Sequence, residues 1–239
     1  MNELVALAIR GHGGIERWEE ISHFKAAGSI SGAILTMKGK GGQLDDVIIE
    51  GEARDQRLKI TPFLGPGKYA TWQPQTQTIE STDGRIILER PEPRAAFAGQ
   101  TLESPWDDFQ VAYFASEATW NYFVAPFVLA RPDFTVKEME TLQEDGEAWR
   151  SLLVTYPDSL VAHTRQQTYY FDELGLLRRL DYSVDVLGGG AAVHYPSDYR
   201  EFDGIMVPTR RRVYVRDPDG TPVRDAVSVA IDISDVIFT

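Results

Sequence analysis

Several polar side chains that could do chemistry lie on one predicted strand, residues 161–171. Successive side chains of a strand point to opposite faces of its sheet. One face of this strand therefore carries His163, Arg165, Gln167 and Tyr169. The other face is polar as well, so neither face has the composition of a simple core. If one face lines a cavity, a strip of hydrogen-bonding groups crosses the cavity wall.

Two later predicted strands add an arginine and a second histidine, Arg179 and His194. An arginine in a cavity could bind a ligand carboxylate or phosphate through two parallel hydrogen bonds, while histidines and tyrosines complete the polar contacts. The structural alternative is that Arg179 forms a salt link with Asp181 on the same face, because charged pairs are common in sheets. The sequence leaves both alternatives open.

No recognisable catalytic motif surrounds these residues. The chain has no cysteine, which excludes disulfides, thiolate zinc sites, iron–sulfur clusters and cysteine nucleophiles. No Gly-x-Ser-x-Gly elbow occurs, and His163 and His194 lack the spacing of a zinc motif. We therefore expect no cofactor and no metal. An enzyme alternative stays open, in which His163 or His194 acts as general base on an anionic small molecule in the same cavity.

The net charge of the chain limits the kinds of partner that it can bind. The chain has 24 lysines and arginines against 36 aspartates and glutamates, a net charge of −12. Such a surface repels phosphate backbones, so we expect no binding to nucleic acid. The N-terminus carries Glu3 where a signal peptide has its basic region. The sequence as given predicts a cytoplasmic protein, or a periplasmic one if a leader has been removed.

One of the elements that must position these side chains is an aromatic helix predicted to begin at Ser104-Pro105, a pair typical of helix starts. Aromatic residues recur in it at steps of three and four, with Ser116 in the one missing place: Trp106, Phe109, Tyr113, Trp120 and Phe123. The helix is apolar nearly all round, which predicts contacts on more than one side, as a buried helix or a lid over an apolar cavity. Charged residues and Pro126 interrupt the run, so we expect no stable membrane insertion.

The remaining elements are predicted strands. Short strands are predicted at residues 26–38, 47–60, 76–80 and 85–89, and longer ones at 149–156, 161–171, 176–186, 191–202, 205–216 and 223–238. Their short, turn-rich connections favour antiparallel pairing between neighbours, and long strands twist, so the sheet must curve. We predict one α+β domain over residues 1–239, with a strongly curved antiparallel sheet and a helical insertion at about 92–135.

Three passages carry a resemblance to a known family: residues 8–18 (AIRGHGGIERW), 169–182 (YYFDELGLLRRLDY) and 198–209 (DYREFDGIMVPT). With the order of elements, they resemble the LolA/LolB-like lipoprotein-carrier superfamily. The resemblance implies an incomplete β-barrel whose concave face is covered by helices and accepts acyl chains or other apolar ligands.

The sequence thus predicts non-enzymatic binding of a hydrophobic or amphipathic small molecule, a lipid or an acyl chain, in the concavity of the sheet. It identifies no particular protein partner. The predicted ligand-binding residues are His163, Arg165, Gln167, Tyr169, Arg179 and His194, together with Trp106, Phe109, Tyr113, Trp120 and Phe123.

Overall fold

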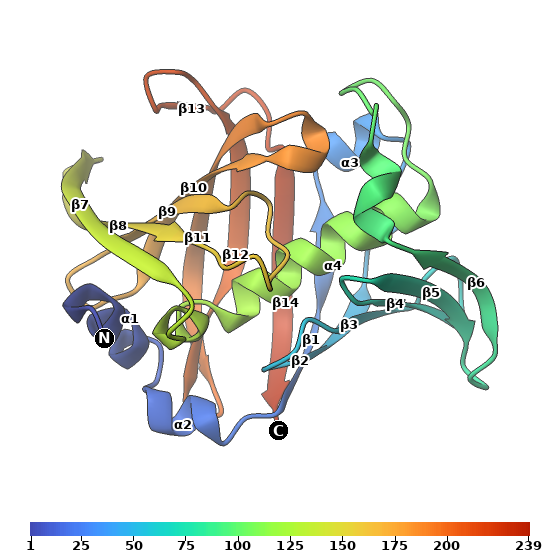
Figure 1. The fold of residues 1–239 in the computed structure, drawn as a ribbon, viewed down its shortest axis with the longest axis horizontal. Coiled ribbons are helices and arrows are strands. Elements are labelled where there is room, and N and C mark those ends of the chain that lie inside the picture. Colours follow the sequence, from blue (N-terminus) through green and yellow to red (C-terminus); the bar gives the residue numbers. More distant parts are fainter.

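One large antiparallel sheet forms most of the structure, a computed structural model that describes all residues from Met1 to Thr239. The sheet has 14 strands in the order β6-β5-β4-β3-β2-β1-β14-β12-β11-β10-β9-β8-β7, and β13 pairs with β12 outside this path. The sheet is open, with β6 and β7 as separate edges, and it curves around one central helix (Figure 1). The predicted α+β class with an incomplete barrel is confirmed. The strands are β1 His23–Ser31, β2 Val47–Glu52, β3 Leu58–Thr61, β4 Lys68–Trp72, β5 Thr76–Ser81, β6 Ile86–Pro91, β7 Thr135–Glu144, β8 Glu147–Thr155, β9 Gln166–Phe171, β10 Leu177–Val184, β11 Gly190–Phe202, β12 Ile205–Arg216, β13 Pro222–Val223 and β14 Val229–Phe238.

Four α-helices and three 3-10 helices accompany the sheet, and only one of them is long. They are α1 Glu3–Gly11, α2 Ile15–Glu19, α3 Ala33–Met37, α4 Asp108–Val124 and the 3-10 turns η1 Pro93–Phe97, η2 Phe127–Ala130 and η3 Asp185–Leu187. The helix α4 lies across the concave face of the sheet (Figure 1). The predicted insertion at about 92–135 therefore corresponds to η1, α4 and η2.

The sequence predicted most strands well and several segments wrongly. Residues 33–37 form α3 instead of extending the first strand, because Gly32 turns the chain with a φ of 124°. Residues 161–165 are not part of a strand: the backbone N–H and C=O of Val161 bond with the side chain of Gln56 instead. Only β13 and β14 occupy the range 223–238, the predicted strand 47–60 is divided into β2 and β3, and β4 and β7 were not predicted.

The helix α4 starts three residues later than the pattern at Ser104-Pro105 predicted. Its N-cap is Asp107, whose carboxylate accepts from the backbone of Gln110 while the Gln110 side chain accepts from the backbone of Asp107. This reciprocal capping box satisfies two free N–H groups, which explains the later start. Every residue from Phe109 to Val124 is buried, as the absence of a polar face predicted. No helix in the structure has the length and apolarity needed to cross a membrane.

All three passages behind the family resemblance meet in space, since the backbone N–H of Met206 also donates to the carbonyl oxygen of His12 at 3.1 Å. The end of α1 lies against the turn between β9 and β10. A Cβ atom on Gly11 would lie 2.4 Å from the carbonyl oxygen of Leu174, and one on Gly175 would lie 2.4 Å from that of Leu7. Both positions therefore require glycine, which lets the backbone of the helix approach the turn directly.

Candidate functional site

A pocket of about 240 Å³ lies between α4 and the strands β10, β11, β12 and β14. Of its 21 lining residues 17 are hydrophobic, and none is a lysine, arginine, aspartate or glutamate. Ligand pockets are typically roughly 300–1,000 Å³ and mostly apolar, so this one has the right composition and a small size. Its walls include Phe114, Ala115, Ala118, Thr119 and Tyr122 from α4, and Tyr182, Val184, Ala192, Val213, Val229 and Ile231 from the sheet.

The pocket exists because the two sides of α4 differ in side-chain size. On the side of β1–β5 it packs with aromatic rings: Phe123 stacks on Phe24 at 4.4 Å and Tyr113 packs edge-on against Trp72 at 6.1 Å. Toward β10–β14 the helix presents Ala115, Ala118 and Thr119. Side chains three and four residues apart share a helix face. The small residues therefore form a continuous stripe that leaves space in front of the sheet.

A strand glycine helps to place the aromatic side of α4. A Cβ atom on Gly51 of β2 would lie 2.2 Å from Cζ of Phe24, so only glycine allows this ring to cross over β2. The Trp120 indole N–H donates to the carbonyl oxygen of Glu52 at 2.8 Å, on the same strand. These contacts hold α4 close to the N-terminal half of the sheet and away from the strands that line the pocket.

One wall of the pocket carries a buried polar cluster of Glu117, Tyr122, His163 and Tyr182, hereafter the tyrosine–histidine cluster. The Tyr122 hydroxyl lies 3.0 Å from Nε2 of His163 and 2.7 Å from the Tyr182 hydroxyl. The other ring nitrogen of His163, Nδ1, lies 2.8 Å from Oε2 of Glu117, although without the alignment of a hydrogen bond. Tyr122, His163 and Tyr182 line the pocket, and Glu117 lies behind His163.

Two hydroxyl groups in this wall have unused hydrogen-bonding capacity. The Thr119 hydroxyl is buried and has no hydrogen-bond partner within the protein. The Tyr182 hydroxyl bonds only with Tyr122, although a phenol can donate one hydrogen bond and accept others. Burial raises the pKa of Tyr182 and raises that of Tyr122 well above its ordinary value, so both phenols remain protonated and uncharged.

A second buried layer, Arg211 and His194, supports Tyr122 from outside the pocket. The Arg211 guanidinium donates to the carbonyl oxygen of Tyr122 at 3.1 Å and lies 3.4 Å from Nε2 of His194. Burial, and then the charge of Arg211, lowers the pKa of His194 well below its ordinary value, so this ring is neutral and accepts at Nε2. His194 therefore positions Tyr122 but does not line the pocket.

The other residues of the predicted polar strip lie apart from His163. Arg165 is exposed and pairs with Asp158 at the surface. Gln167 is buried and donates to the carbonyl oxygen of Thr164 at 3.3 Å. Tyr169 is buried and bonds through its hydroxyl with Tyr156. None of these three lines the pocket. Because β9 begins only at Gln166, His163 and Arg165 do not share the alternation that was predicted to group them with Gln167 and Tyr169.

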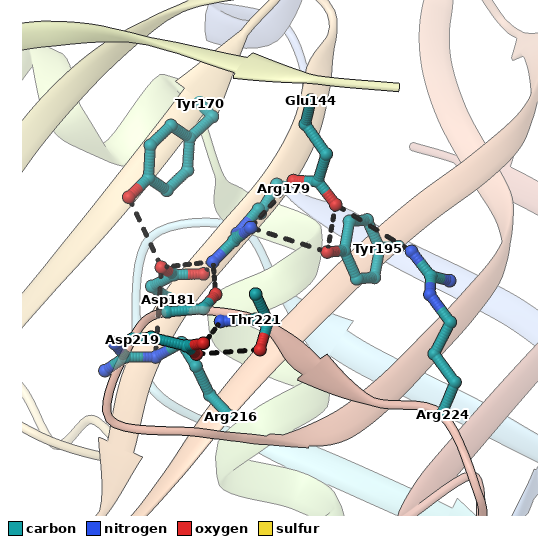
Figure 2. Close-up of polar contacts among 10 residues, drawn as sticks. Glu144, Tyr170, Arg179, Asp181, Tyr195, Arg216, Asp219, Thr221 and Arg224 are labelled. Carbon is teal, nitrogen blue, oxygen red and sulfur yellow. Dashed lines mark hydrogen bonds and ion pairs between the residues drawn. The ribbon is translucent and has the colours of Figure 1, made fainter.

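Arg179 lies on the face of the sheet that points away from α4. Side chains alternate between the two faces of β10, so Arg179 lies on the opposite face from Leu180 and Tyr182. Figure 2 shows its guanidinium between two carboxylates: it makes two hydrogen bonds to Asp181, at 2.7 and 2.9 Å, and one to Glu144 at 2.7 Å. It also donates to the carbonyl oxygen of Gly220. The salt link that the sequence left open as an alternative is present.

The five predicted aromatic residues of α4 and the segment before it also lie outside the pocket lining. Sequence reasoning instead missed Phe114, Ala115, Ala118, Thr119 and Tyr122, with Glu117 behind them. Two features of the sequence could have indicated these residues. Small residues recur on one stripe of an otherwise aromatic helix, and Glu117 is a carboxylate inside an apolar run, which requires a buried partner.

No protein-family model and no curated protein matches the sequence. Three solved structures are similar over nearly the whole chain. A DUF1329 family protein from Desulfovibrio piger has a TM-score of 0.54 at 13% identity, covering 99% of this chain and 92% of that one. A putative outer membrane lipoprotein-sorting protein domain from Vibrio parahaemolyticus has a TM-score of 0.55 at 9% identity, covering 99% and 91%.

The third structure is a LolA superfamily protein from Nitrosomonas europaea, with a TM-score of 0.51 at 13% identity, covering 94% of this chain and 91% of that one. At these identities the likeness concerns the fold alone. The chain has the fold of the LolA superfamily, as the resemblance of its sequence predicted.

Proposed function

We propose that the chain binds a hydrophobic or amphipathic small molecule, with the apolar part of that molecule in the pocket between α4 and β10–β14. The observation that carries the proposal is the stripe of Ala115, Ala118 and Thr119 on a helix that otherwise fills its surroundings with aromatic rings. Each methylene group transferred from water into such a pocket contributes about 0.8 kcal/mol. A short acyl chain therefore gains enough to bind without any ionic contact.

The size of the pocket and the similar structures support a lipid-like ligand. At about 240 Å³ the pocket suits a single chain rather than a lipid with several chains. The solved structure from Vibrio parahaemolyticus, whose description is lipoprotein-sorting, has the same fold, which agrees with a ligand that carries an acyl chain.

Filling the pocket tests this proposal. We expect the purified chain to bind the neutral apolar fluorophore N-phenyl-1-naphthylamine, with an increase in its fluorescence. The variant Ala118→Leu should weaken binding by about tenfold, because the larger side chain occupies the pocket. The control Ala148→Leu changes an exposed residue at the start of β8 and should bind like the unmodified chain. If the unmodified chain takes up no fluorophore, or if Ala118→Leu binds it normally, the proposal is wrong.

A second candidate function is an enzyme that uses His163 as general base. One observation favours it: His163 lies between the Glu117 carboxylate and the Tyr122 hydroxyl in the wall of the pocket. A carboxylate that orients a histidine beside a hydroxyl is the usual arrangement of an activated nucleophile. The absence of lysine and arginine from the pocket lining favours an uncharged substrate over an anionic one.

The enzyme candidate is tested with uncharged p-nitrophenyl esters of increasing acyl length. Catalysis predicts a rate above background that is lost in His163→Gln, while N-phenyl-1-naphthylamine still binds. A rate that is unchanged in His163→Gln would exclude this histidine as the base.

A further inference from the structure

We propose that the pocket selects an uncharged apolar molecule that carries a hydroxyl group, which bonds with Tyr182 and Thr119. This inference rests on the proposed function and specifies the class of ligand. Its basis is the unused hydrogen-bonding capacity of two buried hydroxyl groups in one wall of an otherwise apolar pocket.

Thr119 provides the second observation. The residue is 2% exposed, lines the pocket and has no partner within the protein. A buried hydroxyl without a partner destabilises a fold, and a ligand group that bonds with it removes this cost. Thr119 stands one helical turn before Tyr122 on the same face of α4, so a ligand group that reaches the tyrosine–histidine cluster passes beside it.

The tyrosine–histidine cluster offers the ligand a phenol and no charge. Tyr122 is bonded on both sides, to His163 and to Tyr182, whereas Tyr182 has only Tyr122 as partner. A ligand hydroxyl can donate to Tyr182 or accept from it, so it fits whichever way the hydrogen bonds of the cluster run. A carboxylate can only accept, and it would have to be buried without a cation.

The charges near the pocket oppose an anionic ligand group. The Glu117 carboxylate lies behind this wall, 2.8 Å from His163 Nδ1. Arg211 is a buried cation that donates to the carbonyl oxygen of Tyr122 and to His194. It lies 5.0 Å from the centre of the Tyr122 ring, and this ring separates it from the pocket. Burying a carboxylate without a paired cation is strongly unfavourable. The geometry therefore favours an alcohol over a fatty acid of the same length.

Competition with three ligands of equal length tests the inference: 1-decanol, decanoate and decane, each displacing N-phenyl-1-naphthylamine from the full chain at pH 8. We expect 1-decanol to bind more tightly than either of the others. Tyr182→Phe should weaken 1-decanol by about tenfold and leave decane unchanged, because it removes one hydrogen bond and no apolar surface. Thr119→Val should weaken 1-decanol by a smaller factor in the same selective way.

Tyr156→Phe is the matched control. It removes a hydroxyl from another buried pair of tyrosines, Tyr156 and Tyr169, which does not line the pocket. It should leave the affinity for all three ligands unchanged.

The outcomes separate this inference from the proposed function. If decane and 1-decanol both fail to displace the fluorophore from the unmodified chain, the proposed function and this inference are both wrong. If decane binds but Tyr182→Phe weakens decane and 1-decanol equally, only the inference is wrong. Tighter binding of decanoate than of 1-decanol would also overturn it, because a fatty acid that enters tail first with its carboxylate at the mouth needs neither hydroxyl.

Discussion

The Glu117 carboxylate lies 2.8 Å from His163 Nδ1, and the two side chains are 1% and 4% exposed. Glu117 belongs to α4, whereas His163 belongs to the segment between β8 and β9. The contact thus joins the central helix to the sheet at the wall of the pocket. Asn121 supports it by donating to Oε1 of Glu117 at 3.1 Å.

We expect Glu117→Gln to lower the free energy of unfolding by about 3 kcal/mol, because removing one partner of a buried pair leaves the other without compensation. The double variant Glu117→Gln/His163→Gln should lose less than the sum of the two single variants. Urea denaturation measures the free energy of unfolding of the two single variants and of the double variant. The control Asp133→Asn breaks an exposed pair with Arg131 and should lose less than about 1 kcal/mol. An equal loss in Glu117→Gln and Asp133→Asn would show that the buried contact contributes little.

Thr119→Val should stabilise the chain in the absence of ligand by about 1 kcal/mol, since it removes a buried hydroxyl that has no partner in the protein. Thr209→Val is the matched comparison, because Thr209 is also buried but its hydroxyl donates to the carbonyl oxygen of Asp198 at 2.6 Å. That variant should destabilise the chain. Chemical denaturation of both variants decides the matter, and a loss of stability in Thr119→Val would contradict the prediction.

Stability should fall as the pH is lowered from about 6.5 to 4, in part through His12. Burial, reinforced by the charge of Arg211, lowers the pKa of His12 from 6.5 to about 4, against a hydrogen bond to Ala8 O that raises it. Between these values the unfolded chain binds a proton that the folded chain does not, so folding is favoured above pH 6.5 and the contribution is lost below it. The loss from His12 alone is roughly 3 kcal/mol, and His194, whose pKa is also lowered, acts in the same direction.

The variant His12→Gln should reduce this pH dependence, measured as the free energy of unfolding between pH 4 and 7.5. His23→Gln, at an exposed position on β1, serves as the control and should leave the slope unchanged. A slope that is the same in His12→Gln as in the unmodified chain would contradict the assignment to His12.

Arg179→Lys should loosen the turn between β12 and β13. A lysine cannot make the two parallel bonds to Asp181 and at the same time reach Glu144 and Gly220 O, as the guanidinium does (Figure 2). We expect faster hydrogen exchange at residues 217–221 and a loss of about 2 kcal/mol in the free energy of unfolding. Arg178→Lys, at the neighbouring position, should change neither, because Arg178 contacts Glu147 at 3.6 Å and the Trp149 ring rather than this turn. Unchanged exchange in Arg179→Lys would show that the turn is held by other contacts.

The sequence by itself determined the antiparallel architecture. The hairpin of β5 and β6 and the long strands β11 and β12 occupy almost the predicted ranges, because turn residues such as Asp83-Gly84 and Asp203-Gly204 act locally. The burial of α4 was also predictable, since a helix without a polar face must be covered on all sides. Each of these inferences depends on residues close together in the chain.

Only the tertiary structure decided which side of α4 borders the pocket and which side chains meet there. The aromatic row Trp106–Phe123 suggested the pocket wall, yet Tyr113 and Phe123 pack against β4 and β1, and smaller residues of α4 leave the space. The partners Glu117 and His163 come from segments whose approach depends on how the whole sheet curves around the helix. The physical reason is that periodicity gives the faces of an element, while the packing of distant elements decides what each face contacts.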